Sequence, residues 1–465
     1  MRMRMSARRL PSRVPKMSSD KRAVLKQWLA SGKASLQPLT FPQRELWEAS
    51  PVRVSDMANH ICCVINVRGV MTHPACESAL QRVVDRQEAL RLSFLPGKNG
   101  PLQLIRQSSE ADLRFRELTP AQREEQAVEE LAAEIFAEPF DLLQGPLYQS
   151  ALFRCGPEDH ILVFAIHHAI ADGWTLGVFV EDLCLAYIQG LMGVTDALPP
   201  VGLTYSAWGV AEREFWSPAE LETRASFWRP ILAGAPRHWN ALEGSATASG
   251  PHQRWVTHLP VAMAEAAQDL ARVSGATLYS TFLALFQIAL SRWTGEPDTV
   301  VGTPIANRSM QSVRETMGYC ATIVPARVHV DRQRPFADNL REVHQTTVEG
   351  FANAMPFVEL ASALGDEAQP GHNPVFEVRF ALQNHPVPDV SLHGLSAKLK
   401  MRSTGTARFH LGCEITVVPD GLELVWLFRP NLFPKVEIEN LARIFNTALE
   451  SASRSPEGRI ASLTN

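Results

Sequence analysis

The chain has 465 residues, of which 45% are hydrophobic and 20% charged, and its formal net charge is −4. This length is enough for two or three domains of ordinary size. The slightly acidic balance disfavours broad nucleic-acid binding, which usually needs a basic domain. No apolar run approaches the roughly 18 to 20 residues that span a bilayer. We therefore expect no nucleic acid and no membrane as a partner.

The seven cysteines are odd in number, and none shows the Cys-x-x-Cys or Cys/His spacing of a metal site. Such a pattern predicts reduced thiols, no bound metal and a cytoplasmic location.

Residues 1–37 predict an N-terminal tail that ends in a short helix. The start, MRMRMSARRLPSRVPK, is basic and lacks the apolar stretch of a secretory signal. It is either a disordered tail, with Met17 as a possible true start, or a docking tail for a partner enzyme. Residues 19–31 (SDKRAVLKQWLAS) have the apolar spacing of an amphipathic helix.

The first half of the chain alternates between strand and helix patterns. Thr119 and Ser217 are each followed by proline, which is typical of helix N-caps. The expected strands are 60–68, 90–94 and the continuous apolar run 160–166, and the expected helices are 75–88, 119–136, 174–188 and 217–232.

The second half has the same mixture. The expected helices are 262–272, 278–293, 336–352 and 436–451, and the expected strands are 299–303, 375–381, 409–418 and 422–428. Residues 236–253 are rich in Gly, Ser, Pro and Thr, which favours a boundary there. The fold class is therefore α/β or α+β, with an N-terminal lobe at 38–235 and a C-terminal lobe at 236–465.

One segment combines residues that suit acid–base chemistry. His167 and His168 follow the buried strand 160–166, and Asp172 and Gly173 precede a helix. A histidine at a strand end can project into a cleft, where neutral imidazole accepts a proton near pH 7. Asp172 can hold the loop by pairing with an arginine, and Gly173 permits a tight exit into the helix. From this segment alone, a catalytic histidine and a histidine of the core remain equal alternatives.

The same segment resembles the HHxxxDG motif of condensation domains from nonribosomal peptide synthetases. Other segments resemble that family's motifs in the family's order. They are LTFPQRELW (39–47), RQEALRLSF (86–94), PFDL (139–142) with GPL (145–147), Tyr205 and Trp208 of a YxxW pattern, VGTPIANR (301–308), MPF (355–357) and NPVF (373–376).

The resemblance implies two chloramphenicol-acetyltransferase-like lobes in a V around a central tunnel. In that family a carrier protein inserts its phosphopantetheine arm from one face, and the acceptor enters from the other. The chain itself would then bind no cofactor covalently. It also lacks the Asp-Ser-Leu or Asp-Ser-Ile attachment motif, so we expect a carrier protein that acts in trans on a free-standing enzyme.

The resemblance also implies roles for individual residues. His168 is the expected catalytic residue and His167 a structural one, while Asp172 pairs with an arginine of segment 86–94, for which we favour Arg91 over Arg86. Trp174 is expected to pack under the motif. Three further residues of the tunnel region, which either shape a loop or contact substrate, are Thr303, Asn307 and Arg308.

The implied reaction is attack of an amine or hydroxyl on a carrier-bound acyl or peptidyl thioester. The chain departs from the family pattern at 319–322 (YCAT) and at 409–411 (FHL). These departures favour a free small-molecule amine or alcohol as acceptor, in chain release or tailoring. Two alternatives remain, an O-acyltransferase of lipid or polyketide type and a non-catalytic recruitment domain of the same fold.

Overall fold

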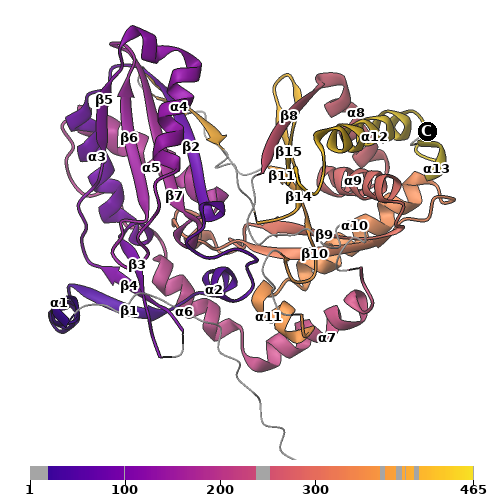
Figure 1. Cartoon of the computed structure of the whole chain (residues 1–465), viewed down its shortest axis with the longest axis horizontal. Helices are drawn as coiled ribbons and strands as arrows, with labels where there is room; N and C mark the ends of the chain where they lie inside the picture. The colour runs from indigo at the N-terminus through magenta and orange to yellow at the C-terminus, as the bar shows by residue number, and fades with distance from the viewer. Residues whose placement is uncertain are drawn as a thin grey trace, which may run out of the picture.

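A computed structural model describes residues 19–98, 100–236, 252–366, 372–383, 390–392, 394–402 and 408–463. Each of two lobes is built on a six-stranded sheet with helices packed against it. The sheets diverge from the end of the molecule at which α2 and α11 lie, so the lobes form a V (Figure 1). The mixed α/β fold class predicted from the sequence is confirmed.

The sheet of the N-terminal lobe has the strand order β12-β13-β2-β7-β6-β5. A smaller sheet with the order β1-β4-β3 lies beside it. The strands are β1 (Ala34–Pro38), β2 (His60–Arg68), β3 (Leu92–Leu95), β4 (Leu102–Arg106), β5 (Arg114–Glu117), β6 (Tyr148–Arg154), β7 (Asp159–His167), β12 (Val390–Leu392) and β13 (Leu395–Arg402). The helices are α1 (Ser19–Ala30), α2 (Phe41–Glu48), α3 (His73–Arg86), α4 (Glu125–Phe136) and α5 (Gly173–Leu191).

Strand β7 is central in this sheet because its apolar run can be buried on both faces. It pairs antiparallel with β2, from His60 opposite His167 to Arg68 opposite Asp159. Helix α5 follows β7 after a short turn and packs against α3. The motif residues 167–173 therefore lie between a buried strand and a buried helix.

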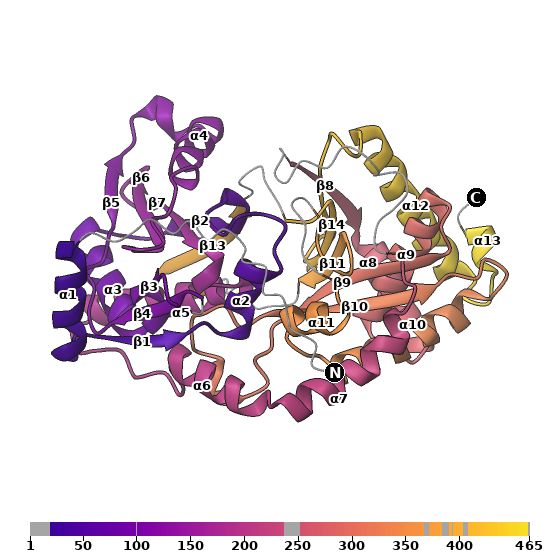
Figure 2. The same ribbon diagram turned by 60° about the horizontal axis from the view of Figure 1, so that its bottom comes forward.

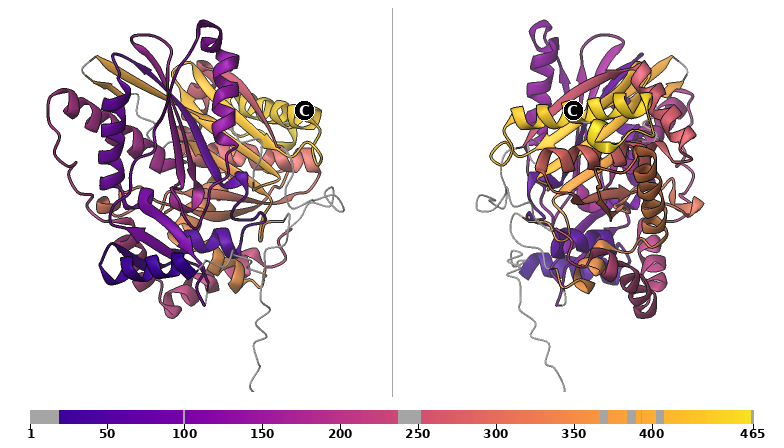
Figure 3. Two further views of the ribbon diagram at one scale, coloured as in Figure 1. Left: turned by 60° about the vertical axis from the view of Figure 1, so that its left-hand side comes forward. Right: turned by 90° about the vertical axis from the view of Figure 1, so that its right-hand side faces the viewer.

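The sheet of the C-terminal lobe has the strand order β10-β9-β11-β14-β15-β8. Its strands are β8 (Gln253–Pro260), β9 (Asp298–Ile305), β10 (Thr322–His329), β11 (Val378–Gln383), β14 (Leu411–Val418) and β15 (Gly421–Phe428). Its helices are α8 (Val261–Val273), α9 (Leu278–Thr294), α10 (Phe336–Ala352), α11 (Phe357–Ala363), α12 (Lys435–Arg454) and α13 (Ile460–Leu463). Figure 3 shows α12 and α13, in yellow, on the outer side of this lobe.

Two connections cross between the lobes. Helices α6 (Tyr205–Phe215) and α7 (Pro218–Leu232) run beneath both of them (Figure 2), and Trp228 of α7 donates a hydrogen bond to Asn353 O of the second lobe at 2.9 Å. In the opposite direction, β13 pairs antiparallel with β2 of the first lobe. Contacts thus cross the predicted boundary at 235/236 from both sides, and residues 237–251 lie outside the described residues.

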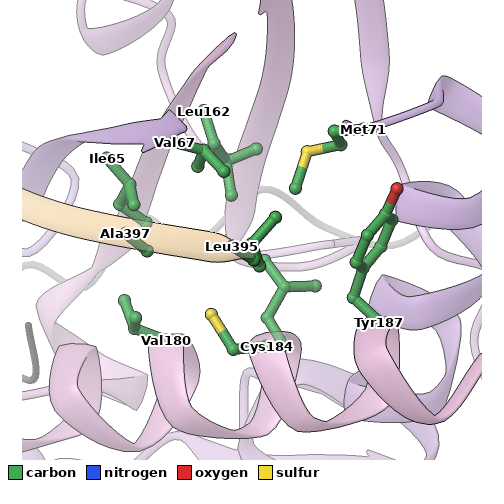
Figure 4. A pocket seen from close by; sticks show the side chains of 10 residues that line it. Ile65, Val67, Met71, Leu162, Val180, Cys184, Tyr187, Leu395 and Ala397 are labelled. Carbon is green, nitrogen blue, oxygen red and sulfur yellow. The ribbon is translucent and has the colours of Figure 1, made fainter. Parts of the chain in front are cut away.

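The hairpin β12–β13 covers a small apolar cavity of about 20 Å³. Its lining residues come from β2, β7, β13, α5 and the start of the β2–α3 turn (Figure 4). Leu395 and Ala397 of β13 close it on one side, and Val180 and Cys184 of α5 face them (Figure 4). With only apolar side chains around it, this volume is a packing defect of the core.

Several predicted boundaries shift for local reasons. The helix expected over 119–136 is interrupted, because Pro120–Arg123 form a 3-10 turn and Glu124 is extended before α4 begins. The strand expected from residue 90 begins at Leu92, after a 3-10 turn. The strand expected from residue 375 begins at Val378, because Val375 has a φ of 71°.

All seven cysteines are buried and unpaired. Burial raises the pKa of the Cys62 thiol to about 12, so this thiol is held in its unreactive protonated form. Within the described residues no single helix is long and apolar enough to cross a bilayer, although α8 and α9 together have the length and composition, with a 104° bend between them.

Candidate functional site

His167 is locked in one tautomer at the end of β7. Its Nε2 lies 2.8 Å from Val54 O, which can only accept, so Nε2 carries the proton. Its Nδ1 accepts from Ala169 N at 3.0 Å. Burial lowers the pKa of His167 to about 3. With both nitrogens used and no exposed surface, His167 supports the turn.

His168 has the opposite tautomer. Its Nδ1 lies 2.8 Å from Ala171 O, so Nδ1 carries the proton and the lone pair is on Nε2. The ring packs against Tyr319, with centroids 4.3 Å apart. Burial and then the positive charge of Arg408 lower the pKa of His168 to about 3. The ring is therefore a neutral base with its acceptor nitrogen turned away from the turn.

Asp172 is the N-cap of α5, and Gly173 is the first helical residue. The carboxylate of Asp172 accepts from Thr175 N at 3.0 Å, which satisfies an otherwise free helical N–H. It also accepts from Cys320 N at 3.1 Å and Ala321 N at 3.2 Å. The side chain fixes both the start of α5 and a segment of the second lobe.

The predicted pair of Asp172 with Arg91 is wrong, because the partner of Asp172 is Arg308. Arg308 Nη2 lies 3.2 Å and 3.3 Å from the two carboxylate oxygens, and the side chains are only 1% and 4% exposed. Arg91 instead donates to Val84 O at 3.0 Å and Gln107 O at 2.9 Å, which ties its 3-10 turn to the chain after β4. Arg86, the other candidate, pairs with Asp182 and Glu315.

Arg308 organises the loop that follows β9. It donates to Val313 O, Thr316 O and Gly318 O at 2.9, 2.6 and 2.9 Å. Trp174 Nε1 donates to Arg314 O in the same loop at 2.8 Å, and the Arg308 guanidinium lies 6.0 Å from the Trp174 ring.

The other predicted tunnel residues lie apart from His168. Thr303 forms a hydroxyl–hydroxyl hydrogen bond with Tyr279. Asn307 has a φ of 52° and lines a cavity of about 20 Å³ together with Glu45 and Glu212. This cavity has room for about one water molecule, and burial raises the pKa of Glu212 to about 8.

Three residues that were not predicted from the sequence complete the site, and they are Arg408, Glu45 and Tyr319. Arg408 Nη2 lies 3.3 Å from His168 Nε2, and Nη1 lies 3.3 Å from Glu45 Oε1. Tyr319 donates its hydroxyl to the same Glu45 oxygen at 3.2 Å. Burial raises the pKa of Glu45, while the charge of Arg408 opposes this shift. Glu45 lies in the recognised segment 39–47, and Tyr319 and the Phe409 that follows Arg408 lie in the segments that depart from the family pattern.

In the described part of the chain, the group of side chains that could hold a metal ion is His372, Glu377 and His410, whose ligand atoms lie within 4.8 Å of one another. Two histidines and a carboxylate are a donor set that suits zinc. The carboxylate of Glu377, however, already accepts from Asn373 N at 3.1 Å, Asn373 Nδ2 at 3.2 Å and His372 Nδ1 at 3.0 Å. Hydrogen bonds within the group therefore account for its arrangement.

Two α/β lobes that jointly enclose a His-His-x-x-x-Asp-Gly turn define an acyltransferase of the HHxxxDG type. The model of the condensation domain family matches residues 33–465, so the chain belongs to the condensation domain family. Members of this family in nonribosomal peptide synthetases transfer acyl groups to form amide bonds.

Among curated relatives, phosphinothricin tripeptide synthetase PhsC of Streptomyces viridochromogenes is 30% identical over 440 residues, which are 92% of this chain and 40% of that protein. A linear gramicidin synthase from Brevibacillus parabrevis is 28% identical over 446 residues, or 92% of this chain and 8% of that protein. The chain thus spans less than half of the one relative and less than a tenth of the other.

Solved structures show the same fold. The X-domain from teicoplanin biosynthesis has a TM-score of 0.81 at 21% identity, with 92% of this chain and 97% of that chain covered. The first condensation domain of the calcium-dependent antibiotic synthetase, in complex with a substrate analogue, has a TM-score of 0.78 at 20% identity, with 92% and 98% covered.

Proposed function

We propose that this chain joins a carrier-bound acyl or peptidyl thioester to an amine or hydroxyl acceptor, with His168 as the catalytic residue. The observation that carries this proposal is the state of the His168 ring. Its Nδ1–H is fixed on Ala171 O at 2.8 Å, which leaves the lone pair on Nε2. A neutral imidazole held in this way is suited to accept a proton from an attacking group.

The proposed reaction needs no covalent enzyme intermediate. The acceptor nitrogen or oxygen attacks the thioester carbonyl while His168 Nε2 takes its proton. The tetrahedral intermediate then collapses, the C–S bond breaks, and the thiolate leaves with that proton. Much of the acceleration comes from holding both reactants at the ring. The roles of His167, Asp172 and Arg308 are to fix the turn that carries it.

The donor in this proposal is a phosphopantetheine arm presented by a carrier protein. The relatives named above are peptide synthetases and synthases, which supports a carrier partner. We further propose a free small-molecule amine or alcohol as acceptor. This finer assignment is supported by Tyr319, a residue of the departing segment 319–322, which packs directly on the His168 ring.

A second candidate is a recruitment domain without chemistry. It is favoured by one observation, because Arg408 covers the nitrogen that would act as base. The fold alone does not distinguish the two, since one of the solved X-domain structures is a complex with OxyB.

The test uses candidate acyl-carriers loaded with donor, mixed with amine and alcohol acceptors, and followed by intact-protein mass spectrometry. His168→Ala is expected to lower turnover about 10²- to 10⁴-fold, with a larger loss for an alcohol because a hydroxyl depends more on the base. The control is His329→Ala, an exposed position on β10 that should keep full turnover. Full turnover by His168→Ala would refute the catalytic assignment, and binding of a carrier without any turnover would favour the recruitment candidate.

A further inference from the structure

The guanidinium of Arg408 occupies the position at which an acceptor would have to approach His168. Since Nδ1 carries the proton, Nε2 can only accept, and Arg408 Nη2 donates to it at 3.3 Å. No lone pair of His168 is then available for an incoming N–H or O–H.

Arg408 is held in this position from several sides. Glu45 accepts from Nη1 at 3.3 Å, and Glu45 in turn accepts from Tyr319 at 3.2 Å. The backbone is held as well, because Asn373 Nδ2 donates to Arg408 O at 2.9 Å. The side chains of Arg408 and Glu45 are 11% and 5% exposed, so the pair is poorly screened by solvent.

The charges that face Arg408 identify what it does. Glu45 is its carboxylate partner, and Tyr319 and His168 are neutral neighbours. A permanent cation beside the ring opposes protonation of the imidazole and so keeps it able to act as base. The same cation covers Nε2 whenever no acceptor is present.

We propose that Arg408 is a positioning residue for the acyl-transfer site, which caps His168 Nε2 between turnovers and yields this nitrogen only to an acceptor. This inference rests on the proposed function, since it assigns the cap to the atom that would act as base. Its consequence is protection of the donor. Without the cap, water can bind at Nε2 and attack the thioester carbonyl, with transfer of its proton to the ring. The C–S bond then breaks, and a carboxylic acid and a free thiol are formed.

The first experiment reads the cap without turnover. Diethyl pyrocarbonate acylates an unprotonated imidazole nitrogen, and peptide mass spectrometry reports the rate at His168 alone. We expect Arg408→Gln to react about tenfold faster than the unaltered chain, the effect of losing one hydrogen bond to a charged donor. Arg408→Lys, which keeps the charge but loses the planar fork, should be intermediate. Arg402→Gln is the matched control, because Arg402 lies nearby in sequence but pairs with Glu129.

The second experiment measures loss of a loaded donor thioester without acceptor. Arg408→Gln should hydrolyse it several times faster than the unaltered chain, and Arg408→Gln combined with His168→Ala should return to the slow rate. Equal or slower acylation of His168 in Arg408→Gln and Arg408→Lys, both with unaltered melting temperatures, would overturn the inference. If the unaltered chain turns over no donor at all, the proposed function fails, while the acylation rates still report whether the cap exists.

Discussion

The buried pair of Asp172 and Arg308 should be one of the costliest single contacts to break in this protein. We consider Asp172→Asn and Arg308→Met, each of which removes one charge while keeping a similar shape. Asp172→Asn leaves the Arg308 guanidinium in a site where both side chains were at most 4% exposed. It also places an amide N–H₂ opposite backbone donors, because Cys320 N and Ala321 N both point at the carboxylate.

The magnitude follows from burial. Removal of one partner of a buried ion pair typically costs about 3–5 kcal/mol, because the other charge stays uncompensated. Arg308→Met additionally leaves the carbonyls of Val313, Thr316 and Gly318 without this donor, so we expect its loss to lie at the upper end. The double variant should lose less than the sum of the single variants, because neither charge is then left alone.

The assay is the free energy of unfolding from urea denaturation of the two single variants and the double variant. The matched control is Asp298→Asn, which breaks a pair with Arg327 whose side chains are 26% and 22% exposed. That pair should contribute no more than about 1 kcal/mol. A loss for Asp172→Asn no larger than that of the control, or additive losses in the double variant, would refute the reasoning.

Two further predictions concern stability. Burial lowers the pKa of His167 and His168 to about 3, against about 6.5 when unfolded, so between these values the unfolded chain binds protons that the folded chain does not; the free energy of unfolding should fall on acidification below about pH 6.5, by up to about 1.4 kcal/mol per pH unit for each histidine. Thermal unfolding at pH 7 to 5 measures this, and His168→Gln should flatten the slope, whereas an unchanged slope would contradict the assignment. Leu395→Ala, which enlarges the cavity under β13, should lower the free energy of unfolding by about 2–5 kcal/mol, whereas the exposed Lys400→Ala should change it by no more than about 0.5 kcal/mol; equal effects in urea denaturation would show that the hairpin adds nothing to the core.

Local patterns in the sequence were sufficient for most of the secondary structure. The strand 60–68 and the helix 336–352 have the predicted bounds, because each is a regular apolar repeat with a clear end. The turn between β7 and α5 was also predicted, since an apolar strand, a capping aspartate and a helix follow one another directly along the chain. Each of these features depends on residues within a few positions of one another.

Long-range pairings were missed for the opposite reason. No strand was expected at 390–402, yet β13 pairs with β2 across more than half of the chain. The partner of Asp172 was sought in segment 86–94 and lies in the loop after β9. In both cases the sequence near the residue shows that a partner is needed, while only the packing of the two lobes determines which segment supplies it.

The second lobe holds the two halves of the motif with very different strength. Asp172 is fixed by a buried charge pair and by backbone donors from Cys320 and Ala321, which makes the turn a permanent part of the junction. His168 Nε2 receives a single hydrogen bond from Arg408 at 3.3 Å, near the long end of the range for N–H donors. Such a bond contributes on the order of 1–3 kcal/mol, which an acceptor that forms its own hydrogen bond to the ring can replace. A rigid aspartate and a replaceable arginine are thus compatible in one site, because the first fixes where the ring lies and the second controls what reaches it.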